Sequence, residues 1–474
     1  MAPQVAAKTN IKQIITIAVF SFLIPLTVNA MEAKLTRFTL PNGLKVFVKE
    51  DHAVKVATIQ LWVMVGSSDE VGSEKGISHL IEHMAFKGTE RRGVGEIARE
   101  VEALGGATNA YTSLDETVFH VTVPSRATLK GLDIILDAVL NPIVDPKELE
   151  KEKQVVVEEI LDGLERPVRK STKQLFKTAY VKSPYHYPVI GFKKNVEAFT
   201  REDIISFRKK WYVPENMFLV IVGDVDPDKL KPEIERLTGK LKANGFFRPP
   251  KPVEPVQEKI RTALVRDNNS RETRYHIAFH IPSMKGADVN SLDVAASILG
   301  GRDSSRLTRL LKKEKGLVNS ISTYALTLKD SGLFLISATL DAKNLEVVTK
   351  TVFEEIQRLG KEIPSSEEVD RAKTDIESNL LYANETVDGI GQLMGSFEAQ
   401  VGDITYEKKY LSLNRAVTAQ EASKVVTKYL APPNVTLSAL VPEGEVPDFK
   451  MEKLEQIVDA SSKPPRPTRR LRIR

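Results

Sequence analysis

The order of predicted elements before residue 243 recurs after residue 257, and this repeat constrains the fold more than any other feature. The intervening segment, 243–257, contains four prolines and is typical of a linker. Alternating β-branched residues predict strands, and helical apolar spacing predicts helices. The repeated order is strand, strand, helix: 44–49, 57–65 and 76–86 before the segment, and 262–266, 274–280 and 290–299 after it. The sequence therefore predicts an α+β protein of two tandem duplicated domains, each a mostly antiparallel sheet packed with helices.

Two further pairs of predicted helices support the duplication. Residues 96–104 correspond to 306–315, since a glycine follows each, and residues 148–161 correspond to 366–381. The expected organisation is a signal peptide at 1–30, an N-terminal domain at 31–242, the linker at 243–257, a C-terminal domain at 258–450 and a basic tail at 451–474.

The first thirty residues have the layout of a secretory signal peptide. Lys8 and Lys12 are the only charges before an uncharged stretch, 13–31, whose apolar core is 14–26. Val28 and Ala30 place small residues at the −3 and −1 positions of a cleavage site. We therefore expect cleavage after Ala30 and export to a bacterial periplasm. The disfavoured alternative is an uncleaved membrane anchor, because nineteen uncharged residues are marginally long enough to span a bilayer.

Charge and cysteine content exclude several classes of function. The net charge is +5, but the last fourteen residues carry six cations and no acid, so the body of the chain is slightly acidic. We therefore expect no nucleic-acid partner. The chain has no cysteine, which excludes a thiol nucleophile and Cys-ligated metals. Any metal must be bound by histidine and carboxylate side chains.

The predicted helix at 76–86 carries His79-Leu80-Ile81-Glu82-His83. Because residues four apart lie one turn apart on the same face of a helix, both imidazoles can reach a single metal ion. Glu82 lies beside the second histidine, where it can take a proton from water. This HxxEH order is that of the inverzincins.

A zinc site of this kind needs a third protein ligand and an open position for water. The acidic helix 148–161 offers Glu158 and Glu159, and the residue pattern alone does not choose between them. Glu152 and Glu159 are seven residues apart and therefore share a face, so one could bind the metal while the other orients the site.

These motifs together resemble the pitrilysin/insulinase-like (M16) zinc metallopeptidase family. The resemblance rests on HLIEHMAFKGT at 79–89, on Leu-Gly-Gly at 104–106, on Asn-Ala-Tyr-Thr at 109–112 and on the acidic helix. It is strongest to the half-length members, which include the mitochondrial processing peptidase β-subunit and bacterial periplasmic relatives. The resemblance implies Glu159 as the third zinc ligand, Glu152 as its support, and a strand at Asn109 and Ala110 that pairs with an extended peptide.

The second half of the chain lacks the HxxEH motif. Leu292, Ala295 and Ala296 occupy the places of His79, Glu82 and His83, so one Zn²⁺ per chain is expected. Active family members also carry an Arg, followed seven residues later by a Tyr, that contact the substrate. Lys312 and Asn319 stand at these positions here. Neither is a good replacement for a planar guanidinium and a phenol. In half-length relatives this pattern implies a heterodimer in which a homologous partner without zinc supplies the pair; a homodimer is the other possibility.

The sequence thus predicts a zinc metalloendopeptidase, the catalytic subunit of an enzyme that hydrolyses extended peptides inside a closed chamber. Its catalytic base would be Glu82 and its metal ligands His79, His83 and Glu159. The alternative is a non-catalytic structural or assembly subunit of the same fold. The intact HxxEH motif argues against that alternative, and the missing Arg/Tyr pair argues for it.

Overall fold

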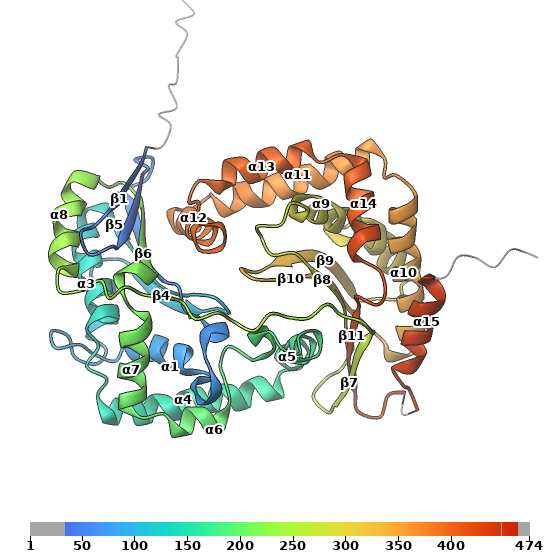
Figure 1. The fold of residues 1–474 in the computed structure, drawn as a ribbon, viewed down its shortest axis with the longest axis horizontal. Helices are drawn as coiled ribbons and strands as arrows, with labels where there is room; N and C mark the ends of the chain where they lie inside the picture. The colour runs from blue at the N-terminus through green and yellow to red at the C-terminus, as the bar shows by residue number, and fades with distance from the viewer. Residues whose placement is uncertain (1–33, 447, 463–474) are drawn as a thin grey trace, which may run out of the picture.

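The computed structural model describes residues 34–446 and 448–462, which form two halves placed side by side (Figure 1). The predicted signal peptide and the end of the basic tail lie outside the described residues. Each half is built on one β-sheet with helices packed against it. The prediction of two tandem α+β units is confirmed. No helix among the described residues is both long enough and apolar enough to cross a membrane.

The first sheet has six strands in the order β1-β2-β6-β3-β5-β4. All neighbours are antiparallel except β2 and β6. The sheet ends on β4, which pairs with β5 on one side only, so its other edge is free. The strands are β1 (Leu35–Thr39), β2 (Lys45–Glu50), β3 (Val56–Val63), β4 (Ala107–Thr112), β5 (Thr117–Pro124) and β6 (Met217–Gly223).

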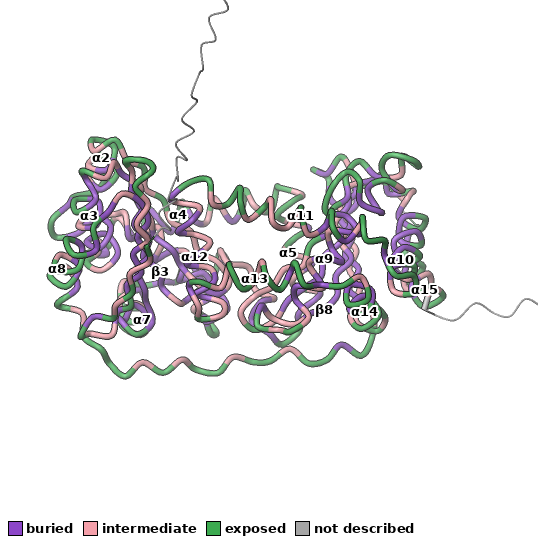
Figure 2. Tube along the Cα trace, turned by 90° about the horizontal axis from the view of Figure 1, so that it is seen from above, coloured by how far each residue is buried: buried purple, intermediate pink, exposed green. Residues whose placement is uncertain are grey.

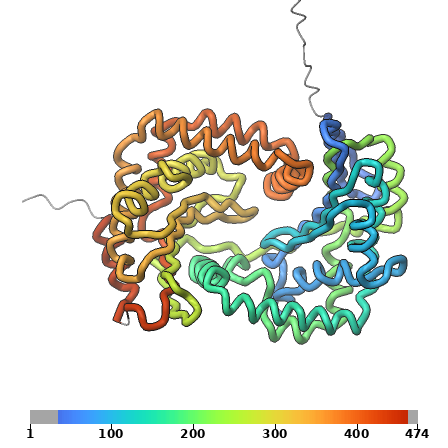
Figure 3. Tube along the Cα trace, turned by 180° about the vertical axis from the view of Figure 1, so that it is seen from behind, coloured from blue at the N-terminus to red at the C-terminus, as the bar shows by residue number. Residues whose placement is uncertain are grey.

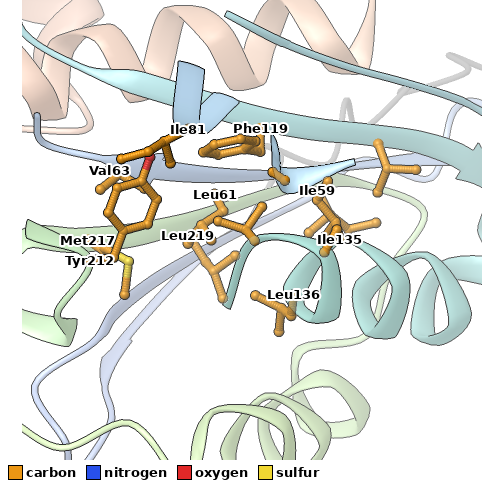
Figure 4. Close-up of a cluster of buried hydrophobic side chains, with 14 of the residues drawn as sticks. Ile59, Leu61, Val63, Ile81, Phe119, Ile135, Leu136, Tyr212, Met217 and Leu219 are labelled. Carbon is orange, nitrogen blue, oxygen red and sulfur yellow. The ribbon is translucent and has the colours of Figure 1, made fainter. Parts of the chain in front are cut away.

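One face of this sheet packs against α1 and α3, and the resulting core contains Leu61, Phe119 and Leu219 on adjacent strands (Figure 4). The longest helix, α4, begins where Asp145 accepts hydrogen bonds from the N–H groups of Lys147 and Glu148. The helices are α1 (Ile77–Ala85), α2 (Glu96–Ala103), α3 (Thr128–Leu140), α4 (Pro146–Glu165), α5 (Pro167–Ala179), α6 (Lys193–Ala198), α7 (Arg201–Trp211) and α8 (Pro227–Thr238).

The second sheet has five strands in the order β7-β11-β8-β10-β9 and repeats the first without a counterpart of β1. As with β2 and β6, the pair β7 and β11 is parallel. The strands are β7 (Arg261–Asp267), β8 (Thr273–Ile281), β9 (Ser320–Thr327), β10 (Gly332–Leu340) and β11 (Thr436–Pro442).

The helices of the second half include one irregular element, the π-helix η6 (Thr308–Glu314), within the helix expected at 306–315. The α-helices are α9 (Val289–Gly300), α10 (Leu345–Lys361), α11 (Ser366–Ala383), α12 (Val387–Val401), α13 (Tyr406–Ala416), α14 (Ala419–Tyr429) and α15 (Glu452–Ser462). Leu454 and Val458 of α15 are buried in the second core, so this core extends past residue 450. Short 3₁₀ turns complete the chain: η1 (Ser67–Asp69), η2 (Gly72–Glu74), η3 (Ser125–Ala127), η4 (Pro184–His186), η5 (Pro214–Asn216) and η7 (Ala342–Asn344).

One helix from each half packs on the sheet of the other half (Figures 1 and 3). Helix α12 of the second half covers the remaining face of the first sheet, where Ile390 and Met394 pack with Trp62. Helix α5 of the first half packs in the same way on the second sheet, through Leu175 and Ala179. Each sheet is therefore covered by helices on both faces, and one of the covering helices comes from the other half.

Residues 243–257 contain no helix or strand and pass between the halves as a largely exposed segment (Figures 1 and 2). Several side chains hold this segment against the body of the protein. Arg248 pairs with Asp69, and Lys251 pairs with Asp115 at 3.0 Å. Glu254 accepts the backbone N–H groups of residues 181–183. The segment is thus held at several points along its length.

Candidate metal centre

Helix α1 begins after a closely packed loop. Gly76 precedes the helix with a φ of 101°, and a Cβ there would lie 2.7 Å from the carbonyl oxygen of Ile190. The buried carboxylate of Glu70 accepts the N–H of Gly76 at 2.8 Å and that of Ser78 at 2.9 Å. Burial raises the pKa of Glu70, and these two hydrogen bonds oppose the shift. The first turn of the helix that carries HxxEH is therefore anchored by a side chain from outside the helix.

The structure brings His79, His83 and Glu159 together. Oε2 of Glu159, on α4, lies 3.7 Å from Nε2 of His79 and 4.0 Å from Nε2 of His83. All three potential ligand atoms lie within 4.8 Å of one another. A tetrahedral zinc ion with bonds of about 2.0–2.1 Å places its ligand atoms about 3.4 Å apart. The cluster is therefore slightly wider than a closed zinc site, and small side-chain movements would bring it to that size.

His83 is oriented by the side chain that the resemblance implied. Oε2 of Glu152 lies 3.1 Å from Nδ1 of His83, and Oε1 of Glu152 lies 2.6 Å from Nζ of Lys87. Burial raises the pKa of Glu152, but the bonds from His83 and Lys87 outweigh it and hold this pKa below its ordinary value. A carboxylate bonded to Nδ1 leaves Nε2 of His83 free to bind a metal.

His79 is also suited to bind a cation. Burial is the main cause that lowers its pKa to about 4, and the neighbouring His83 adds to the effect. The ring is therefore neutral at physiological pH, as a metal ligand must be. Two imidazoles and one carboxylate are the ligand set of many catalytic zinc sites. By geometry and by donor chemistry, the residues present fit one zinc ion.

Glu82 lies next to this cluster and is not one of its three converging groups. The hydroxyl of Thr112, on β4, donates to Oε2 of Glu82 at 2.6 Å. Burial raises the pKa of Glu82, although the bond from Thr112 opposes the shift. A carboxylate held in this way, with one oxygen already bonded, can exchange a proton through its other oxygen.

A pocket of about 380 Å³ opens beside the cluster, and every residue that lines it belongs to the first half. His79, Glu82 and Glu159 line it together with Ala110 and Thr112 of the edge strand β4. The pocket therefore connects the metal cluster with a strand that has one free edge.

Asn109 and Ala110 lie on β4 as the resemblance implied, and Asn109 is exposed. The backbone N–H of Ala110 donates to Oδ1 of Asn109 at 2.9 Å. No sequence motif indicates a role for the Thr112 side chain, or for Arg169 and Lys173, two cations of α5 that line the same pocket. Their spacing of four residues was a helical signal, but nothing in the sequence showed that this face meets the pocket.

Lys312 and Asn319 do not line this pocket. Lys312 is exposed on η6, and Nδ2 of Asn319 donates to Oε2 of Glu272 at 3.0 Å. In the second half, the residues at the corresponding places, Leu292 and Ala295, are fully buried. Among the described residues, the cluster of His79, His83 and Glu159 is the one group of three or more ligands found.

Comparison with known proteins gives consistent matches along the chain. Residues 45–192 match the family described as insulinase (peptidase family M16), and residues 198–376 match the peptidase M16 inactive domain. An uncharacterized zinc protease of Rickettsia felis is 31% identical over 413 residues, which cover 86% of this chain and 98% of that protein. The mitochondrial-processing peptidase subunit beta of Blastocladiella emersonii is 27% identical over 94% of this chain and 97% of its own length.

A solved structure is similar over the same extent. The crystal structure of a protease from Helicobacter pylori aligns with a TM-score of 0.82 and 26% identity, covering 86% of this chain and all of the other. The resemblance inferred from the sequence motifs is confirmed. From the fold, the cluster and these matches, we conclude that the protein belongs to the insulinase family of peptidases, peptidase family M16.

Proposed function

We propose that the chain is the catalytic subunit of a zinc-dependent endopeptidase that hydrolyses extended peptides. The observation that carries the proposal is the position of Glu82, a half-buried carboxylate bonded to Thr112 beside His79, His83 and Glu159. The similarity to zinc proteases supports the choice of metal. A subunit with only a structural role would have no need of two histidines and a carboxylate that converge beside a second carboxylate with a raised pKa.

His79, His83 and Glu159 would hold the zinc ion, with Glu152 orienting His83. When bound, zinc supplies Lewis acidity toward a carbonyl group and lowers the pKa of water. Thr112 occupies Oε2 of Glu82, which leaves Oε1 to accept the proton from the attacking water. Glu82 then gives this proton to the amine nitrogen that leaves as the peptide bond breaks.

The free edge of β4 is the proposed binding site for the substrate backbone. An extended peptide that pairs with this edge gains main-chain hydrogen bonds and passes directly over the pocket. The side chain of Asn109 would have to rotate away from the edge, because its Oδ1 accepts the backbone N–H of Ala110 in the structure. The peptide carbonyl would replace Asn109 as the acceptor, so this N–H stays bonded throughout.

We propose that a second chain completes the enzyme. Lys312 and Asn319 lie away from the pocket, and Asn319 is engaged with Glu272. A homologous partner without zinc would supply an Arg/Tyr pair and close the chamber around the peptide; a second copy of this chain is the alternative. The similarity to a peptidase that is itself named as a subunit supports an assembly of unlike chains.

The proposed location is the periplasm, after cleavage of residues 1–30. The support is the pattern of two lysines, an uncharged apolar stretch and Ala30 at the cleavage position. Determination of the N-terminus of the protein isolated from its native host tests this. A first residue of Met31 in a periplasmic fraction agrees with the proposal, and an intact Met1 in a membrane fraction contradicts it.

Two measurements on one sample of purified residues 31–474 test the main proposal. The first is hydrolysis of a quenched peptide library, and the second is the zinc content. We expect one zinc per chain and turnover that a chelator abolishes and added zinc restores. Turnover by the chain alone would show that no partner is needed. A zinc-loaded chain without activity should gain activity with the homologous partner; if it stays inactive, the structural alternative replaces the proposed peptidase.

A further inference from the structure

The wall of the zinc pocket carries two cations that the proposed mechanism does not use. Arg169 and Lys173 both belong to α5 and both line the pocket. Residues four apart on a helix lie on one face, about 6 Å from each other. The two side chains therefore form a short positive row that begins at the metal cluster.

Arg169 lies at the inner end of this row. Its Nη1 donates to Oε1 of Glu159 at 3.3 Å, while Oε2 of Glu159 faces the two histidines. Glu159 would share its single negative charge with a bound cation, so it would not fully neutralise Arg169. The side chain of Arg169 is 49% exposed, which leaves its other donors open to a ligand.

Lys173 lies one turn further along and has no acidic partner in the part of the chain that the structure describes. Within the described residues, no carboxylate lies within 4.0 Å of its ammonium group, and the ring of Phe192 lies 5.9 Å away. Burial, and then the charge of Lys177, lowers the pKa of Lys173. A half-buried ammonium group without a counter-ion is destabilised, and a negative group supplied by a ligand would relieve this.

The other residues that line the pocket also favour a negatively charged ligand group. Ile160, Leu164, Val189 and Ile190 give it an apolar wall, which lowers the local dielectric constant. Its carboxylates, Glu82 and Glu159, are bonded to Thr112 and Arg169. A negatively charged ligand group therefore faces two cations that have unused hydrogen-bond donors.

We propose that this pocket selects extended peptides that carry a carboxylate side chain within about two residues of the scissile bond. Lys173 would bind the carboxylate and Arg169 would be the second cation. The limit of two residues follows because Arg169 contacts a metal ligand, Lys173 is about 6 Å further along, and an extended chain advances about 3.3 Å per residue. The inference rests on the proposed peptidase function and adds a substrate class to it.

Peptides that differ only in Glu, Gln or Lys at one position near the scissile bond, with both ends blocked, test the selection through kcat/KM. We expect Glu to exceed Gln by about tenfold at one position, with Lys the poorest, and the preference to weaken with added salt. A Gln peptide with a free C-terminus two residues beyond the scissile bond shows whether a terminal carboxylate substitutes for the side chain. Equal rates for the Glu, Gln and Lys peptides would overturn the inference.

Charge reversal on α5 locates the selection. Lys173→Glu should turn the preference toward Lys peptides. Lys177→Gln removes a charge one turn further along α5 without placing a carboxylate next to Lys173, and because Lys177 does not line the pocket this variant should retain the preference for Glu. If the two variants behave alike, the selection does not come from Lys173.

Binding measurements separate this inference from the peptidase proposal. Fluorescence anisotropy of labelled Glu, Gln and Lys peptides with the zinc-loaded Glu82→Gln variant reports recognition without turnover. Tighter binding of the Glu peptide, together with a wild-type chain that never hydrolyses, would support charge selection and overturn the peptidase. Equal binding of all peptides, or none, would overturn the charge selection whatever the enzyme does.

Discussion

Glu152→Gln removes one negative charge behind His83 with little change in shape. Glu152 is 5% exposed, and its carboxylate lies 3.1 Å from Nδ1 of His83 and 2.6 Å from Nζ of Lys87. A hydrogen bond to an ionised partner contributes about 1.5–3 kcal/mol. At 1.4 kcal/mol per factor of ten, its loss should weaken zinc binding about 10- to 150-fold. The same range is typical of groups that orient metal-bound histidines.

Competition with a chromophoric zinc chelator at fixed pH measures this change. Glu158→Gln is the matched control, because Glu158 lies on the same helix, has the same charge and is exposed. We expect the control to bind zinc like the wild type. Wild-type affinity in Glu152→Gln, or an equal loss in both variants, would refute the view that Glu152 orients His83.

Two further predictions concern the scaffold. Gly395→Ala should lower the urea midpoint, because a Cβ on α12 would overlap the buried indole of Trp62; overpacking costs about 1–3 kcal/mol and exceeds the gain of about 0.5–1 kcal/mol in helix propensity. A raised midpoint would contradict the packing of α12 on the first sheet. Hydrogen bonding to Arg306 lowers the pKa of Glu368 to about 2. A depressed pKa stabilises the fold above pH 4.5, and this contribution is lost as the pH falls toward 2. Urea unfolding between these pH values should therefore show a smaller loss of stability in Glu368→Gln than in the wild type, and parallel profiles would contradict the ion pair.

The repeat of predicted elements was enough to predict the tandem architecture, because strands and helices follow from local periodicity. The packing of α5 on the second sheet and of α12 on the first sheet could not be predicted from local periodicity. An apolar helix face shows that a helix is covered, but not which sheet covers it. Residues such as Trp62 and Val220, buried on the second face of the first sheet, depend on a helix that is distant in sequence. The π-helical form of η6 likewise has no signal in apolar spacing.

The candidate site likewise contains some residues that the local sequence pattern predicts and others that only the tertiary structure brings together. His79, Glu82 and His83 follow from spacing within one helix, which is a local property. The choice between Glu158 and Glu159 depends on how α4 is rotated against α1, and only the family spacing suggested Glu159 before the structure was known. The structure directs Glu159 to the histidines and leaves Glu158 exposed. The approach of Arg169 and Lys173 depends on the break between α4 and α5 at Arg166, whose extended backbone precedes Pro167.

The central claim is that three side chains hold zinc while Glu82 moves the proton. Measurement of zinc content and peptide turnover in the same samples of wild-type and Glu82→Gln protein, each with any partner that the wild type needs, tests it most directly. We predict one zinc per chain in both and turnover in the wild type alone, with a loss of at least about a hundredfold in the variant. Turnover near the wild-type rate in a zinc-loaded Glu82→Gln chain, or zinc lost together with the carboxylate, would contradict the claim.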